Sequence, residues 1–97
     1  MTARIQSSSA NTLRLATELQ ALLRVHGERN WIRGVAEVAA MLEAGNVASA
    51  ASSYKAMVGG NGSFSDFYFP AEEFGERRRL NQPLDQLRDD LWVALGL

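Results

Sequence analysis

The sequence predicts one small domain of the all-α class, a bundle of four helices with one irregular, glycine- and aromatic-rich segment at about residues 59–70. Three observations lead to this prediction. Apolar residues recur with the 3.6-residue period of a helix in four stretches of the chain. Residues that cap or end helices separate these stretches. A chain of 97 residues is also too short for two domains.

Composition narrows the functional classes. Ten Lys and Arg residues face eleven Asp and Glu residues, so the formal net charge is -1 and we expect neither nucleic acid nor a membrane as partner. The chain has no cysteine, which excludes disulfides and thiolate metal sites and suits a reducing cytoplasm. The polar, Ser-rich N-terminal stretch lacks the apolar run of a signal peptide. We therefore expect a cytoplasmic protein without a metal or another cofactor.

The first predicted helix follows a polar stretch, residues 1–10, which we expect to be a disordered lead-in to a single helical domain over residues 11–97. Asn11 is suited to cap this helix, and Gly27 to end it. Its apolar arc contains Leu15, Ala16, Leu19, Leu22 and Leu23.

Two further helices are predicted as an αα-hairpin, because Gly45 can end one helix and Asn46 can cap the next directly. Asn30 is the predicted cap of the earlier helix. The apolar rows are Trp31, Val35, Val38 and Leu42 in one helix and Val47, Ala50, Ala51, Tyr54, Met57 and Val58 in the other. Gly34 lowers helix propensity, so we expect a neighbouring backbone to approach there.

The last part of the chain is predicted to contain a turn and then one more long helix. The Asn61–Gly62 pair indicates a turn with positive φ, and the aromatic run after it is either irregular or a short strand. Residues 71–80 are predicted to form a helical turn in which Glu73 meets Arg77. Pro83 fits the first position of the last helix, after a cap at Asn81 or Gln82, with Leu84, Leu87, Leu91 and Leu95 as its apolar row.

Catalytic chemistry has little support in the sequence. His26 is the single histidine and no cysteine is present, so any nucleophile–base triad would depend on His26 alone, and we expect no enzyme activity. His26 is interpreted as a packing residue at the end of the first helix. One alternative stays open, in which His26, Glu28 and Asp66 converge as the acid–base set of a small ligand-binding or enzymatic domain.

The ring-rich segment is the strongest candidate for contact with another protein. It holds Phe64, Phe67, Tyr68 and Phe69, half of the aromatic residues of the chain. These rings can cover the core, or they can exceed what a small core hides and form an interface. The predicted partner-binding residues are Phe64, Asp66, Phe67, Tyr68 and Trp92. Within this set, Asp66 is expected to cap a backbone turn.

Three short motifs resemble a family of short bacterial domains of unknown function. They are an H-G-x-x-x-W pattern at His26–Trp31, an L-x-x-G-[DN] joint at Leu42–Asn46, and a G-x-G-S-F-x-D segment at Gly60–Asp66. The resemblance implies a small helical domain and assigns no activity.

From these features we predict a non-enzymatic protein-binding module. One form of it is an immunity or inhibitor protein that occludes a bacterial toxin or enzyme. A homodimer that pairs through the leucine-rich first helix is the other predicted partnership.

Overall fold

The structure, a computed structural model, describes residues 2–59 and 62–97, and only the backbone of residues 2–8. Four α-helices and one turn of 3-10 helix account for the regular structure in this part of the chain, which contains no strand. The elements are α1 (Thr2–Val25), α2 (Trp31–Glu43), α3 (Val47–Val58), η1 (Phe64–Asp66) and α4 (Phe74–Ala94). The predicted all-α bundle of four helices is confirmed.

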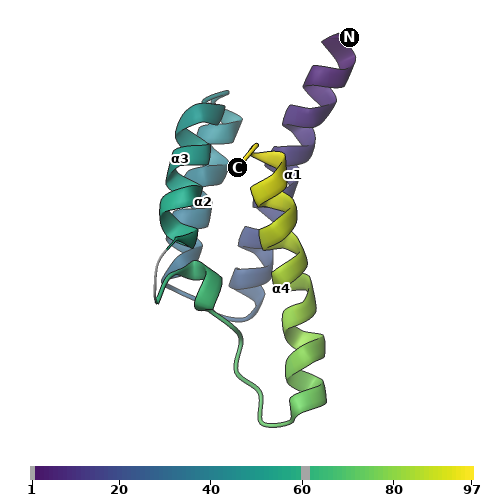
Figure 1. The fold of residues 1–97 in the computed structure, drawn as a ribbon, viewed down its shortest axis with the longest axis vertical. Helices are drawn as coiled ribbons and strands as arrows, with labels where there is room; N and C mark the ends of the chain where they lie inside the picture. Colours follow the sequence, from purple (N-terminus) through teal and green to yellow (C-terminus); the bar gives the residue numbers. More distant parts are fainter. Residues whose placement is uncertain (1, 60–61) are drawn as a thin grey trace.

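Helix α1 is the central element of the bundle. It packs along α2 and α4, while α3 packs on α2 and receives η1 at one end (Figure 1). The molecule measures 47 × 23 × 21 Å and is elongated because the first turns of α1 and of α4 project at opposite ends (Figure 1). Helices α3 and α4 lie on the same side of α2 and α1 (Figure 1), and the Tyr54 hydroxyl of α3 bonds to the Arg88 carbonyl of α4.

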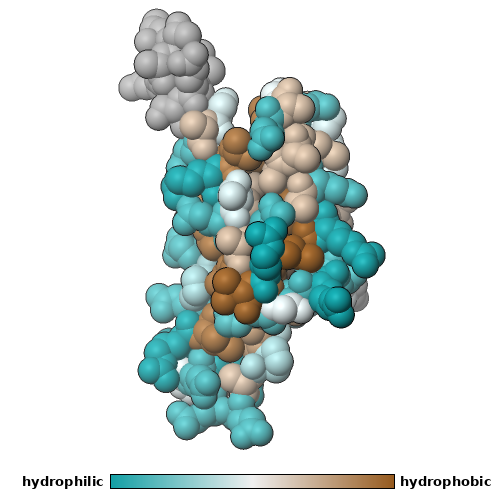
Figure 2. Space-filling model, turned by 180° about the vertical axis from the view of Figure 1, so that it is seen from behind, coloured by the Kyte–Doolittle hydropathy of each residue, from teal (hydrophilic) through white to brown (hydrophobic). Residues whose placement is uncertain are grey.

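The four apolar rows meet in one core. Its buried helix residues are Leu15, Ala16, Leu19, Leu23, Val35, Val38, Ala39, Leu42, Ala50, Tyr54, Leu84, Leu91 and Leu95. Seen from behind, the molecule shows hydrophobic side chains in the middle of the face and hydrophilic ones around them (Figure 2). Leu15, Leu19 and Leu23 of α1 are buried in this core and Leu13 and Leu22 are partly buried against it, while the homodimer through this helix stays a prediction.

The start of α1 differs from the prediction. The helix begins at Thr2, and the side chain of Asn11 accepts a hydrogen bond from Arg14 (2.6 Å) instead of capping a helix end. Residues 2–10 contain no Gly or Pro, so nothing in their backbone chemistry stops a helix that is anchored further along. The predicted start at Asn11 is wrong, and the disorder of residues 1–10 stays a prediction.

The joints between the first three helices use the predicted glycines but not the predicted caps. Gly27 and Gly45 have φ angles of 71° and 81°, as helix-ending glycines should. Neither Asn30 nor Asn46 makes a side-chain cap hydrogen bond. The α2 cap is the Glu28 carboxylate, whose two oxygens accept the backbone N–H groups of residues 30, 31 and 32 at 2.7–2.9 Å. A carboxylate also brings a full negative charge to the positive end of the helix dipole.

Gly34 is closely approached, but by a side chain. A Cβ atom placed on Gly34 would lie 2.7 Å from the Met57 sulfur, so the thioether of α3 occupies the space that the glycine leaves on α2. The predicted approach of a neighbouring backbone is therefore replaced by a contact between the Gly34 backbone and the Met57 side chain.

Helix α4 begins nine residues before the predicted first position. Pro83 lies inside the helix, so the predicted turn over 71–80 and the last helix are one continuous element. Pro83 has no N–H for the Arg79 carbonyl, and the helix continues across this gap because Leu84 and Leu91 anchor it in the core. The Arg77 guanidinium donates to the Ala71 carbonyl (3.1 and 2.9 Å), so its predicted pairing with Glu73 is wrong.

Removal of the α2 cap should weaken the fold measurably. Glu28→Ala leaves three backbone N–H groups without their carboxylate, and we expect a loss of about 1–2 kcal/mol in the free energy of unfolding. Urea unfolding followed by circular dichroism measures this loss. The matched control is Arg29→Ala at the next, exposed residue, which should stay within about 0.5 kcal/mol of the wild type. Equal stability of the two variants would show that the cap makes no net contribution.

Candidate functional site

The ring-rich segment starts with a turn that closes the end of α3. Gly62 has a φ of 70°, and its N–H donates to the Asp66 carboxylate (2.9 Å), so Asp66 caps this turn as predicted. The hydroxyls of Ser63 and Ser65 both donate to the Val58 carbonyl, at 2.8 and 2.9 Å. The Gly-Ser-Phe-x-Asp part of the motif thus has a structural role, while Gly60 and Asn61 lie outside the described residues.

A buried arginine of α4 holds the middle of the segment. Arg88 is only 6% exposed, and its Nη1 donates to the backbone carbonyls of Phe64 and Phe67, the latter at 2.8 Å. Its Nη2 donates to the Asp85 carboxylate at 2.9 Å. The guanidinium carbon lies 5.3 Å from the centre of the Phe64 ring and 4.8 Å from that of Tyr68. This buried charge therefore has an acidic partner and two carbonyl acceptors, as a stable interior requires.

Asn81 of α4 holds the end of the segment. Its Oδ1 accepts the Phe69 N–H (2.7 Å), and its Nδ2 donates to the carbonyls of Phe69 and Arg77 (both 2.9 Å). Pairing both backbone groups of one residue is what a neighbouring strand does in a ladder. The chain leaves η1 in an extended conformation at Phe67, but its backbone hydrogen bonds are made by side chains of α4. The alternative of a short strand is therefore not realised among the described residues.

Most of the rings cover the core. Phe64 and Phe69 are buried and meet the joint between α1 and α2, where Trp31 lies 5.5 Å from Phe64 and His26 stacks 4.0 Å from Phe69, measured between ring centres. Phe67 is half-buried and packs edge-on against Phe69 at 5.4 Å. Phe64 therefore offers no surface to a partner, unlike the prediction for it, and Phe67 offers only part of its ring.

Tyr68 is the ring of the segment that faces outward, with 48% of its surface exposed. It lines two hollows. The α3–α4 cleft, of about 320 Å³, is lined by Tyr54, Val58, Ser65, Tyr68, Asp85, Arg88, Asp89 and Trp92. The α4 groove, of about 810 Å³, runs from Tyr68 along the outer side of α4 past Gly75, Arg78, Gln82 and Gln86. Tyr68, Asp85 and Asp89 are shared by both hollows.

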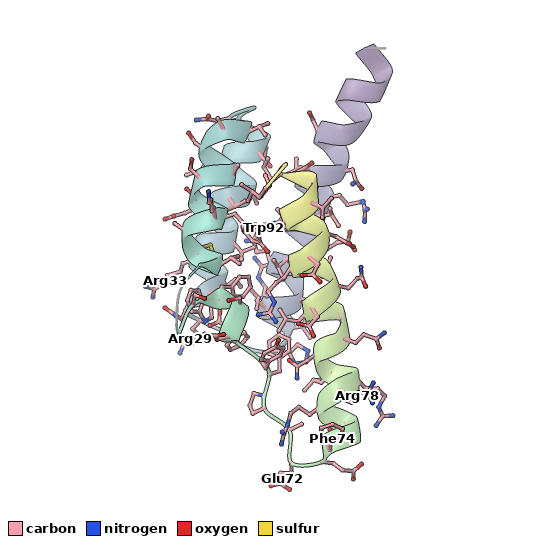
Figure 3. All side chains as sticks on the ribbon, in the orientation of Figure 1. Arg29, Arg33, Glu72, Phe74, Arg78 and Trp92 are labelled. Carbon is pink, nitrogen blue, oxygen red and sulfur yellow. The ribbon has the colours of Figure 1, made fainter. Side chains whose placement is uncertain are left out.

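Two aromatic side chains from the helices, Tyr54 of α3 and Trp92 of α4, line the α3–α4 cleft. Tyr54 is buried and donates its hydroxyl to the Arg88 carbonyl (2.9 Å), and its ring centre lies 6.5 Å from that of Trp92. Figure 3 shows Trp92 on α4 beside the space between α3 and α4. Burial raises the pKa of the Tyr54 phenol well above its ordinary value, the Arg88 charge lowers it in part, and the Asp89 charge adds to the rise. The phenol therefore stays neutral and rigidly bonded.

The three residues of the alternative acid–base set, His26, Glu28 and Asp66, each have contacts with the fold outside the two hollows. Glu28 is bonded to three backbone N–H groups, Asp66 to that of Gly62, and the His26 ring stacks on Phe69. None of the three lines either of the two hollows. Within residues 2–59 and 62–97, no three His, Asp or Glu side chains gather as a metal ion would require. No helix of this part of the chain is both long and apolar enough to cross a bilayer.

The site depends on two buried polar residues that were not predicted from the sequence, Asn81 and Arg88. Their signal is positional, because they lie at helical spacing in the same row as Leu84, Leu91 and Leu95. A polar residue in such a row is buried and needs partners. Phe74, for which the sequence predicted no role, is 70% exposed at the projecting end of α4, near Arg78 (Figure 3).

Comparisons of the chain with protein-family models, curated proteins and solved structures give no match. The resemblance to a family of short bacterial domains stays a prediction.

Replacement of the buried guanidinium should destabilise the fold. In Arg88→Lys one nitrogen cannot occupy the positions of both Nη1, which serves two carbonyls, and Nη2, which serves Asp85, so we expect a loss of at least about 2 kcal/mol in the free energy of unfolding. Urea unfolding measures it. Arg79→Lys, at an exposed position of the same helix, is the control and should change stability by less than about 0.5 kcal/mol. If Arg88→Lys unfolds like this control, the network does not anchor the segment.

Alkaline pH should separate the wild type from Tyr54→Phe. At pH 7 the wild type is expected to be more stable by about 1 kcal/mol because of the hydrogen bond to Arg88. Above about pH 10 the phenol ionises in the unfolded chain but not in the folded one, whose pKa is raised. The wild type then loses up to about 1.4 kcal/mol per pH unit relative to the variant, and the order reverses.

Free energies of unfolding between pH 7 and pH 11 test this reversal. Tyr68→Phe, which keeps Tyr54, should follow the wild type in its decline. A constant difference between the wild type and Tyr54→Phe across this range would contradict the assigned burial of the phenol.

Proposed function

We propose that the chain is a non-enzymatic protein-binding module whose docking surface is centred on Tyr68 and continues to Trp92. One observation carries the proposal: Tyr68 is the exposed ring of a segment whose other rings and backbone groups are fixed to the bundle. A rigid aromatic side chain loses little entropy on binding, and tyrosine and tryptophan are typical energetic anchors of interfaces.

The surroundings of Tyr68 suit an interface. The α3–α4 cleft and the α4 groove adjoin it on two sides and offer concave surface to a partner. Trp92 is half-buried at the edge of the cleft, and the exposed Asp66 and half-buried Phe67 precede Tyr68 in the chain. These four residues belong to the predicted contact set, whereas Phe64, the fifth member, is buried in the core.

An immunity or inhibitor protein is the specific form that we propose, acting in the bacterial cytoplasm by occluding a toxin or enzyme. Two features support it. The domain is small and its docking ring is pre-positioned, and the surface beside the ring is polar and charged, with Asp85 and Asp89 along the cleft and Arg77, Arg78 and Arg79 in the α4 groove. In this form the module works by shape and charge alone and needs no chemistry of its own.

Site-specific photo-crosslinking in the cells that naturally express the protein tests the docking function. A benzophenone amino acid replaces Tyr68 in one variant and Val93 in the control, because Val93 is 74% exposed and lines neither hollow. We expect an adduct with one other protein from position 68 and none from position 93.

Once that protein is purified, Tyr68→Ala should weaken the complex by at least about tenfold while unfolding stays cooperative. Adducts with the chain itself alone would indicate a homodimer through this surface, and equal adducts from both positions would exclude a specific docking site at Tyr68.

A further inference from the structure

The α3–α4 cleft combines aromatic walls with a carboxylate that has no partner inside the molecule. Tyr54, Tyr68 and Trp92 line it, and Tyr54 is fully buried with its ring centre 6.5 Å from that of Trp92. Among the described residues, no hydrogen bond or ion pair engages the Asp89 carboxylate, and Asp89 is exposed on the rim. The volume of the cleft, about 320 Å³, lies at the lower end of the range of roughly 300–1,000 Å³ that is typical of ligand pockets.

The charges that line the cleft leave a negative surplus. Three charged side chains face it: Asp85, Arg88 and Asp89. Arg88 and Asp85 are paired with each other at 2.9 Å, and Nη1 of Arg88 is used by two backbone carbonyls. An anionic ligand would therefore find no free cation here, whereas a cationic one would find Asp89.

The site already holds one guanidinium in the arrangement that a second one would adopt. Arg88 lies against the Tyr68 ring at 4.8 Å and bonds to the carboxylate of Asp85. Planar guanidinium groups stack on aromatic faces and pair with carboxylates through their fixed N–H geometry. The exposed half of Tyr68, the Trp92 indole and the free Asp89 carboxylate offer the same combination on the solvent side of the cleft.

We propose that the α3–α4 cleft receives an arginine side chain of the protein partner, whose guanidinium pairs with Asp89 and lies against Tyr68 and Trp92. The proposal rests on the docking function proposed above and names the chemistry that the partner presents. A purely apolar side chain fits less well, because it would remove water from Asp89 without replacing the lost hydrogen bonds.

A peptide pair that differs in one group tests the cleft directly. The probes are acetyl-Gly-Arg-Gly amide and its citrulline twin, which has the same shape without the charge. The readout is the indole N–H resonance of Trp92 in the intact chain, with the indole of Trp31, the second tryptophan, as internal reference. We expect the arginine peptide to shift the Trp92 resonance saturably and to bind at least about tenfold more tightly than the citrulline peptide.

Two variants locate the binding charge. Asp89→Asn should abolish the preference for arginine, since it removes the free carboxylate and keeps the side-chain shape. Asp90→Asn is the matched control at the next residue, whose carboxylate accepts a hydrogen bond from Gln86 (3.0 Å) and does not line the cleft, and it should keep the preference. Thermal unfolding verifies that both variants remain folded.

The possible outcomes separate this inference from the docking function. Equal binding of the two peptides, an unchanged preference in Asp89→Asn, or a Trp92 resonance that does not move at any soluble peptide concentration each overturns the arginine site. If the crosslink at position 68 nevertheless captures a protein, the docking function stands without it. If the arginine peptide binds and no protein is captured, the cleft is a site for a small guanidinium compound, and the inference about the partner is overturned.

Discussion

The position of the ring-rich segment depends on the buried guanidinium of Arg88. Its N–H groups reach two backbone carbonyls of the segment and one carboxylate of its own helix, and its guanidinium carbon lies over the rings of Phe64 and Tyr68. One side chain can make all these contacts because a guanidinium group has several N–H donors in fixed directions and also stacks on aromatic rings. With Asn81, it gives an extended backbone the hydrogen bonds that a sheet would otherwise supply.

The same anchoring brings together residues from distant parts of the chain. Trp31 and His26, at the joint between α1 and α2, meet Phe64 and Phe69 of the segment. Two of the short motifs in the sequence thus contact each other, and both are explained by structure: Gly27 and Gly62 supply positive φ, Glu28 and Asp66 bond to backbone N–H groups, and the rings fill the space between the helices. Residues that could have suggested acid–base chemistry are engaged in holding the fold.

This arrangement leaves a particular kind of surface. Phe64 and Phe69 are buried in the core and Phe67 is half-buried against it. The exposed apolar surface of the segment is therefore concentrated in Tyr68, beside Trp92 and two carboxylates. Because the backbone under Tyr68 is bonded on both sides, the ring is held in place before any partner arrives. Pre-positioned rings flanked by polar groups are suited to recognition, where specificity comes from shape and charge together.

The sequence by itself determined the helix class, the helix-ending glycines and the four apolar rows, because 3.6-residue periodicity and positive-φ glycines are local properties. Tertiary structure decided the rest. Pro83 could be read as a helix start, yet burial of Leu84 and Leu91 carries α4 across it. Which ring of the segment faces outward depends on Arg88 and Asn81, more than ten residues away along the chain, because the hydrogen bonds and stacking that orient the rings exist only once α4 lies beside them.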